Sequence, residues 1–119
     1  MTDRNAGGDF QGIEIETGPD PRRSIIWLHG LGADGNDFVP VVPELRLPQP
    51  TRFVFPHAPI RPVTINGGYR MRAWYDIFSF DRNALEDGVG IEASAASVRA
   101  LVDRERSAVP RSMTGSCVP

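Results

Sequence analysis

The sequence has no lysine, a single cysteine and no long apolar run among its 119 residues. One cysteine, Cys117, cannot form an internal disulfide bond or a cysteine-based metal cluster, and it fits a reducing compartment. A membrane-spanning helix needs roughly 20 consecutive apolar residues, so we expect no membrane span. Residues 1–10 are polar and glycine-rich and do not resemble a secretory signal peptide. We therefore expect a cytoplasmic protein.

All 13 cationic residues are arginines, and they are spread along the chain from Arg4 to Arg111. With 15 acidic residues, the net charge is only −2. Proteins that bind nucleic acids or acidic membranes concentrate basic side chains in a patch, so this distribution argues against a nucleic-acid partner. Hydrophobic residues make up 40% of the chain and charged residues 24%, a balance that can bury a core. We expect residues 1–119 to form a single domain or part of one.

Apolar patterning predicts alternating strands and helices. In residues 12–17 isoleucine alternates with glutamate, which is typical of a half-buried strand and favours a sheet edge. Residues 24–29 and 51–55 are short apolar runs typical of strands, and the first should be covered on both faces. Helical spacing predicts helices over residues 36–45, where an internal proline should kink or shorten the helix, and over residues 90–106. This order of elements indicates an α/β fold.

Turn signals divide the remaining segments. Residues 1–11 are predicted to form a flexible leader. The sequence Asn66-Gly67-Gly68 separates two extended segments and predicts a hairpin or an extended excursion. The adjacent acidic residues Glu86 and Asp87 are predicted to be a solvated pair that opens the helix after them.

The segment His29-Gly30-Leu31-Gly32 follows a predicted buried strand and precedes a predicted helix. Its backbone amides should therefore lie at the carboxyl end of the sheet, where ligands bind in open α/β sheets. Glycines also let a substrate approach the backbone closely. In α/β-hydrolases a loop of this kind donates one N–H of the oxyanion hole, although the same tetrapeptide also arises as a plain strand-to-helix turn.

A second interpretation uses the same residues, because Gly30, Gly32 and Gly35 form the pattern G-x-G-x-x-G of dinucleotide-binding sites. Such a site needs an acidic residue about 20 positions later to bind the ribose hydroxyls. The sequence has Pro56-His57-Ala58 at this point. A dinucleotide-binding fragment is therefore the weaker interpretation.

Five sequence blocks follow one another between residues 24 and 106. They are Trp27-Leu28-His29-Gly30-Leu31-Gly32-Ala33-Asp34-Gly35, Val42-Pro43-Glu44-Leu45, Phe55-Pro56-His57-Ala58-Pro59, Val63-Thr64-Ile65-Asn66-Gly67-Gly68 and Arg72-Ala73-Trp74-Tyr75-Asp76. In this order they resemble the phospholipase/carboxylesterase family, which includes acyl-protein thioesterases. The resemblance implies the N-terminal part of an α/β-hydrolase fold, with a mixed, mostly parallel sheet and flanking helices. It also implies serine-dependent hydrolysis of carboxylic esters or thioesters in the cytosol, without a metal or other cofactor.

The resemblance further implies roles for individual residues. The backbone N–H of Leu31 would be an oxyanion-hole donor, and His29, Gly30 and Gly32 would support its loop. Trp74 would form part of the pocket wall. The acyl-binding channel would be lined by Ile77, Phe78 and Phe80.

The catalytic half of the family pattern does not follow. The family places its nucleophile in a G-x-S-x-G turn after the next strand, with the acid and the histidine later in the chain, and no G-x-S-x-G occurs in this sequence. The family-like region covers residues 12–110. Residues 111–119 diverge from the expected apolar strand, and we interpret them, as a hypothesis, as a frameshifted tail. We therefore expect the chain to lack the catalytic serine, aspartate and histidine and to be inactive alone.

The absence of the nucleophile strand would leave an apolar sheet edge, which favours aggregation or a partner, including a second copy of the chain in a homodimer. The alternative to an enzyme half is accordingly a non-catalytic module that binds acyl groups or a partner protein.

Overall fold

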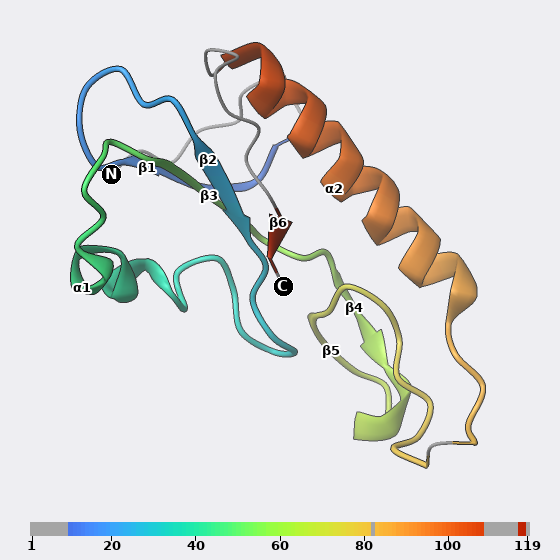
Figure 1. The fold of residues 1–119 in the computed structure, drawn as a ribbon. Coiled ribbons are helices and arrows are strands. Elements are labelled where there is room, and N and C mark those ends of the chain that lie inside the picture. The colour runs from blue at the N-terminus through green and yellow to red at the C-terminus, as the bar shows by residue number, and fades with distance from the viewer. Residues whose placement is uncertain (1–9, 82, 109–116, 119) are drawn as a thin grey trace.

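A four-stranded mixed sheet forms the centre of the computed structural model, which describes residues 10–81, 83–108 and 117–118 (Figure 1). Its strands lie in the order β1 (Gly12–Glu16), β3 (Arg52–Pro56), β2 (Ser24–Trp27) and β6 (Cys117–Val118). Strand β2 is parallel to both β3 and β6, whereas β1 is antiparallel to β3. The predicted edge position of β1 and the mixed, mostly parallel sheet are confirmed.

Apolar side chains pack on both faces of this sheet, because successive residues of a strand point to opposite sides. On one face Phe53 and Phe55 of β3 are buried with Ile13 of β1. On the other face Val54 of β3 is buried with Ile26 of β2. This two-sided packing confirms the prediction that the run beginning at Ser24 is a strand covered on both faces.

The first face is covered by a short helical segment, made of the 3-10 helix η1 (Val39–Val41) and the α-helix α1 (Val42–Leu45). Both lie within the range predicted to be one helix over residues 36–45. The segment is shorter because Pro40 and Pro43 provide no backbone N–H, so each is tolerated only in a first helical turn. Val42 joins the buried cluster on this face.

A two-stranded antiparallel sheet follows β3. It consists of β4 (Ile60–Val63) and β5 (Tyr69–Arg72), joined through the 3-10 helix η2 (Thr64–Asn66) and a glycine pair. Of the two arrangements predicted from the turn signal at residues 66–68, a hairpin or an extended excursion, the structure has the hairpin. Asp76, just beyond the hairpin, is bound to it, since its carboxylate accepts hydrogen bonds from the Thr64 backbone N–H (2.8 Å) and hydroxyl (2.5 Å).

The long helix α2 (Gly88–Ala108) runs beside the sheet in Figure 1 and covers its second face. Leu101 and Val102 pack against the buried cluster around Val54. Asp87 stabilises the start of the helix, because its carboxylate accepts the Gly90 backbone N–H at 3.0 Å. Asp87 thus has the predicted helix-opening role, but it is half-buried and not fully solvated. None of the described helices is long and apolar enough to cross a membrane.

The two ends of the described region differ from the sequence expectation. Phe10 falls in the predicted leader, yet its ring is buried beside Ile26 and Val54, and the Gln11 carbonyl accepts the His57 backbone N–H at 2.9 Å. Residues 10 and 11 therefore pack with the folded domain and do not form part of a flexible leader. Residues 1–9 and most of the predicted divergent tail lie outside the described residues. The exception is β6, which pairs with β2 on the edge predicted to be open.

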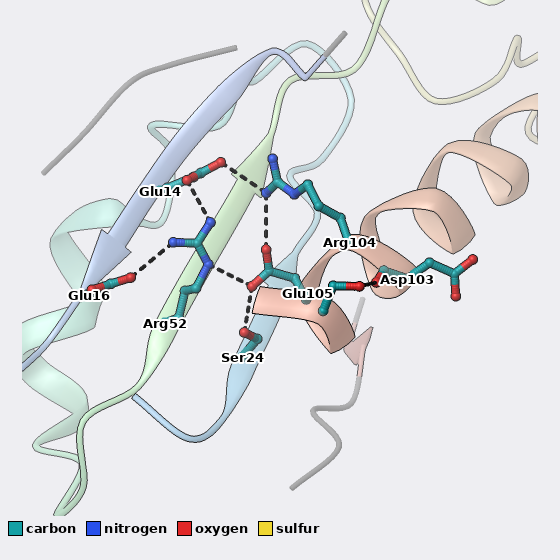
Figure 2. Close-up of polar contacts among 8 residues, drawn as sticks. Glu14, Glu16, Ser24, Arg52, Asp103, Arg104 and Glu105 are labelled. Atoms are coloured by element: carbon teal, nitrogen blue, oxygen red, sulfur yellow. Dashed lines mark hydrogen bonds and ion pairs between the residues drawn. The ribbon is translucent and has the colours of Figure 1, made fainter. Parts of the chain in front are cut away.

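A buried ionic cluster connects the sheet with α2 (Figure 2). The alternation in β1 predicts an exposed Glu14, but this residue is only 2% exposed. Its carboxylate pairs with Arg52 of β3 at 2.6 Å and with Arg104 of α2 at 2.9 Å. Arg52 also pairs with Glu105 of α2 at 2.7 Å. A charge can be buried in this way only when oppositely charged partners and hydrogen bonds compensate its lost hydration.

This environment keeps the Arg52 guanidinium protonated. Burial alone would lower the pKa of its guanidinium, but the hydrogen bonds that it donates to Glu105 and Glu14, together with their negative charges, outweigh this effect and raise the pKa above its usual value. Glu105 additionally accepts the Ser24 hydroxyl of β2 at 2.6 Å. One carboxylate from the helix is thus bound to two neighbouring strands.

Candidate active site

The loop that follows β2 is held by the ring of His29, which is buried at 4% exposure. Its Nε2 atom accepts the Ala58 backbone N–H at 2.9 Å, so this nitrogen carries no proton. Its Nδ1 atom therefore carries the proton and donates it to the Gly30 carbonyl at 2.8 Å. Both ring nitrogens are used in holding backbone groups, which leaves neither of them available as a general base.

The hydrogen bond to the Gly30 carbonyl also orients the next amide. In a trans peptide the C=O and the following N–H point in opposite directions, so the Leu31 N–H points away from the His29 ring. The Gly30 carbonyl is further fixed by the Ala33 N–H at 3.2 Å. Among the described residues, the Leu31 N–H has no hydrogen-bond acceptor, and the Leu31 residue is 42% exposed.

Gly32 fixes the other side of Leu31. Its N–H donates to the Arg72 carbonyl of β5 at 2.9 Å. The backbone of Gly32 has a φ of +77°, a left-handed conformation that glycine adopts without the strain a Cβ atom would add. The Gly30 carbonyl and the Gly32 N–H are therefore both engaged in hydrogen bonds, and the Leu31 N–H between them has no acceptor among the described residues.

Trp74 contacts this loop from outside. Its indole Nε1–H donates to the His29 backbone carbonyl at 2.9 Å, and the two rings lie 5.2 Å apart between centroids. The Trp74 carbonyl in turn accepts a short hydrogen bond from the Ser94 hydroxyl of α2. The sequence pattern did not indicate that Arg72 and Ser94 contribute to this site. Arg72 contributes its backbone carbonyl, and Ser94 binds the backbone carbonyl of Trp74, and every residue possesses such a carbonyl.

Trp74 also lines a groove of about 810 Å³ between α2 and the segment after β3. Pro56, Ala58 and Leu101 form apolar parts of its wall, and Arg72 and other arginines add charge. The structure thus places one sequence-predicted substrate-binding residue beside a cavity. The other predicted substrate-binding residues, Ile77, Phe78 and Phe80, do not belong to this lining.

These three residues lie on the segment between the hairpin and α2. The Ile77 carbonyl accepts the Ile65 backbone N–H at 2.9 Å, which attaches this segment to the hairpin. Phe78 is 41% exposed and Phe80 is 79% exposed. Two aromatic side chains therefore face solvent here.

The third glycine of the G-x-G-x-x-G pattern has a structural explanation. A Cβ atom on Gly35 would lie 2.5 Å from the Phe55 carbonyl oxygen, and the Gly35 N–H donates to His57 Nδ1 at 2.9 Å. A dinucleotide site instead requires these glycines to open a helix that receives the pyrophosphate. Within the described residues, the next helix begins only at Val39, so this geometry does not support the dinucleotide interpretation.

The loop also contains an acidic residue, Asp34. The Asn36 backbone N–H, 2.8 Å from the carboxylate of Asp34, lowers the pKa of this acid below its usual value. In the described part of the chain, no group of three or more histidine, cysteine, aspartate or glutamate side chains is arranged to hold a metal ion.

Comparison with known proteins identifies the family. Residues 11–114 match the family model described as Phospholipase/Carboxylesterase. The chain belongs to this family.

Within the phospholipase/carboxylesterase family, the chain is similar to proteins named acyl-protein thioesterase 1. It is 40% identical to the one from Schizosaccharomyces pombe over 82 residues, which cover 69% of this chain and 37% of the relative. It is 32% identical to the one from Mycosarcoma maydis over 111 residues, which cover 90% of this chain and 46% of the relative. The chain thus spans less than half of the length of these relatives.

Solved structures of the family agree in fold. Acyl-protein thioesterase 2 of Zea mays superposes with a TM-score of 0.71 at 32% identity, covering 89% of this chain and 45% of that one. SOBER1 of Arabidopsis thaliana superposes with a TM-score of 0.73 at 29% identity, covering 81% of this chain and 48% of that one. The described sheet and helices are therefore part of an α/β-hydrolase fold, as the sequence predicted.

Proposed function

We propose that this chain supplies the oxyanion-hole side of a serine hydrolase that cleaves carboxylic esters or thioesters. The observation that carries the proposal is the Leu31 N–H, which has no acceptor among the described residues although the groups around it are bonded. A loop that follows a parallel strand and presents such a donor is the arrangement that acyl-transfer enzymes use. The names of its relatives, acyl-protein thioesterases, support the same class of substrate.

Ester or thioester hydrolysis needs such a donor when the tetrahedral intermediate forms. When a serine oxygen attacks the acyl carbonyl, negative charge develops on the carbonyl oxygen, and a fixed N–H stabilises this charge more than it stabilises the neutral substrate. Removal of one oxyanion donor typically costs roughly 3 kcal/mol of transition-state stabilisation. The nucleophile, the acid and the base act as a unit, and an oxyanion donor without them supplies only a small part of the catalysis. We therefore propose that residues 1–119 alone have no significant turnover.

The remaining parts of the proposal follow from the family resemblance. His29, Gly30 and Gly32 support the loop, and Trp74 forms a wall of the groove. The segment with Ile77, Phe78 and Phe80 lies outside the groove lining and contacts the acyl group beyond it. The reaction needs no cofactor, and we place it in the cytoplasm, which fractionation of cells that produce the tagged chain would test.

A chimera provides the test. Residues 1–110 are joined in frame to the C-terminal half of acyl-protein thioesterase 1 of Schizosaccharomyces pombe, beginning at its next strand, and hydrolysis of a short acyl thioester is measured. We expect saturable activity that a serine-reactive phosphonate abolishes. Leu31→Pro, which removes the N–H, should lower kcat roughly 100-fold, whereas Leu31→Ala, which keeps it, should not. Equal activity of both variants in a folded chimera would contradict the proposal.

The groove beside Trp74 favours a second candidate, a non-catalytic acyl-binding module. In that case the unmodified chain should bind a fluorescent fatty acid saturably, and the chimera should show no serine-dependent turnover. Absence of binding by the chain together with turnover by the chimera would exclude it.

A further inference from the structure

Trp74 connects the oxyanion loop to helix α2 by hydrogen bonds. The Ser94 hydroxyl of α2 donates to the Trp74 carbonyl, and the Trp74 indole N–H donates to the His29 carbonyl at 2.9 Å. The His29 ring then holds the Gly30 carbonyl at 2.8 Å, whose peptide plane carries the Leu31 N–H. These contacts form a continuous path from the helix to the proposed oxyanion donor.

We infer that Trp74 is a positioning residue for the oxyanion loop, in addition to being part of a groove wall. This inference rests on the proposed function, because the loop is worth positioning only if Leu31 donates to substrate. A wall residue would need only an apolar surface. The indole of Trp74 instead uses its one polar hydrogen on the backbone of the loop, and its ring lies against His29 with 5.2 Å between centroids.

The position of Trp74 is itself well determined. The preceding Ala73 is buried, and its N–H donates to the Pro59 carbonyl at 3.0 Å. Two residues later, the Asp76 N–H donates to the carboxylate of Asp87 at 2.8 Å, at the start of α2. The segment therefore has attachments to the chain after β3 and to α2, so it can serve as a fixed reference for the loop.

Fixed geometry matters for an oxyanion donor because its benefit comes from being aligned before the charge develops. Loss of the indole N–H should leave the His29 carbonyl without this donor and should allow the His29 ring and the Gly30–Leu31 peptide to rotate. Replacement by phenylalanine keeps an aromatic ring in the groove wall, so substrate binding away from the carbonyl should change little. The expected kinetic signature is a lower kcat with an unchanged KM.

Amide hydrogen exchange on the full 119-residue chain tests the inference without requiring activity. In Trp74→Phe the Gly32 and Ala58 amides, which bond to Arg72 and to the His29 ring, should exchange roughly fivefold faster. The Phe53 amide in the centre of the sheet should not change. The His29 ring nitrogens should also lose the distinct ¹⁵N shifts of a single tautomer. Trp27→Phe is the matched control, since the Trp27 ring stacks on Phe38 at 4.9 Å.

Unchanged exchange of Gly32 and Ala58 in Trp74→Phe would overturn the inference. If that variant accelerates every amide because it unfolds, Ser94→Ala decides instead. This change removes the hydroxyl donor to the Trp74 carbonyl and leaves a good helix former. Roughly twofold faster exchange confined to Gly32 and Ala58 would support the inference, and unchanged exchange would overturn it.

The chimera separates this inference from the proposed function. If the chimera is active, Trp74→Phe should lower its kcat roughly tenfold with KM unchanged, and an unaltered kcat would overturn the positioning role. If the chimera with Trp74 is itself inactive, the proposed function fails, and the exchange measurements on the chain still decide whether Trp74 orders the loop.

Discussion

The carboxylate of Glu105 on α2 lies 2.7 Å from Nε of Arg52 on β3, and both residues are buried (Figure 2). The fully buried residues of α2 are Gly90 and Glu105, so none of its large apolar side chains is fully buried. Leu101 and Val102 add partly buried contacts to the sheet. The ionic cluster is therefore a principal attachment of the C-terminal part of α2, and a change in it should affect the stability of the whole chain.

Replacing Glu105 by glutamine tests this attachment. The change keeps the size of the side chain but leaves buried Arg52 with one fewer negative partner, which typically costs about 3 kcal/mol. We expect the free energy of unfolding in urea to fall by about this amount. Glu92→Gln, an exposed position on the same helix, should change it by less than about 0.5 kcal/mol. Equal effects of the two changes would show that the ionic cluster does not hold the helix.

The glycines of the G-x-G-x-x-G pattern should differ sharply in their tolerance of alanine. A Cβ on Gly35 would lie 2.5 Å from the Phe55 carbonyl oxygen, whereas a Cβ on Gly30 would meet no atom within 4 Å. We expect Gly35→Ala to lower the free energy of unfolding by about 2 kcal/mol and Gly30→Ala to have little effect. Urea titration of both variants measures this, and a Gly30→Ala variant as unstable as Gly35→Ala would contradict it.

The strands and the hairpin were predictable because their signals are local. Residues 25–28 and 53–55 are apolar on successive positions, as strands with two covered faces must be. The glycine turn at residues 66–68 determines the hairpin in the same local way. For the helix over residues 36–45, Pro43 predicts a kink or a shortening, and the helical segment is indeed shorter. Apolar spacing alone does not show that it begins as the 3-10 helix η1.

The ionic cluster could not be predicted, because its members are far apart in the sequence. Glu14 occupies a position that the alternation in β1 assigns to solvent, and only the folded chain brings Arg52 and Arg104 beside it. The candidate site likewise has one part that the sequence predicts and one part that it does not. The loop around Leu31 has a sequence signature, whereas the bond from Trp74 to the His29 carbonyl has none, since any residue can offer a carbonyl.

Stability should decrease in acid through Asp76 and Asp87. The hydrogen bonds from Thr64 lower the pKa of Asp76, and those from the Asp76 and Gly90 backbone N–H groups lower the pKa of Asp87. A carboxyl whose pKa is lower in the folded state stabilises the fold fully above its unfolded pKa of about 3.9. This contribution is lost as the pH falls through the folded pKa.

The Tm of the chain, followed by circular dichroism, should therefore fall as the pH is lowered from 5 through about 4 and below. The double variant Asp76→Asn and Asp87→Asn should have a lower Tm at pH 7 and a shallower dependence on pH in this range. Asp103→Asn, an exposed position on α2, is the control and should reproduce the original curve. An unchanged acid dependence in the double variant would assign the acid sensitivity to other groups.

The exposed aromatic residues Phe78 and Phe80 should control the preference for acyl-chain length. An acyl chain that packs on such a ring gains about 0.8 kcal/mol for each buried methylene group, so removal of a ring penalises long chains and spares short ones. In the active chimera, Phe78→Ser and Phe80→Ser should raise the KM for a dodecanoyl thioester roughly tenfold and leave that for an acetyl thioester unchanged. Tyr69→Ser, at another exposed aromatic position, should alter neither value. An equal rise for both substrates would assign these rings to the structure of the loop and not to acyl binding.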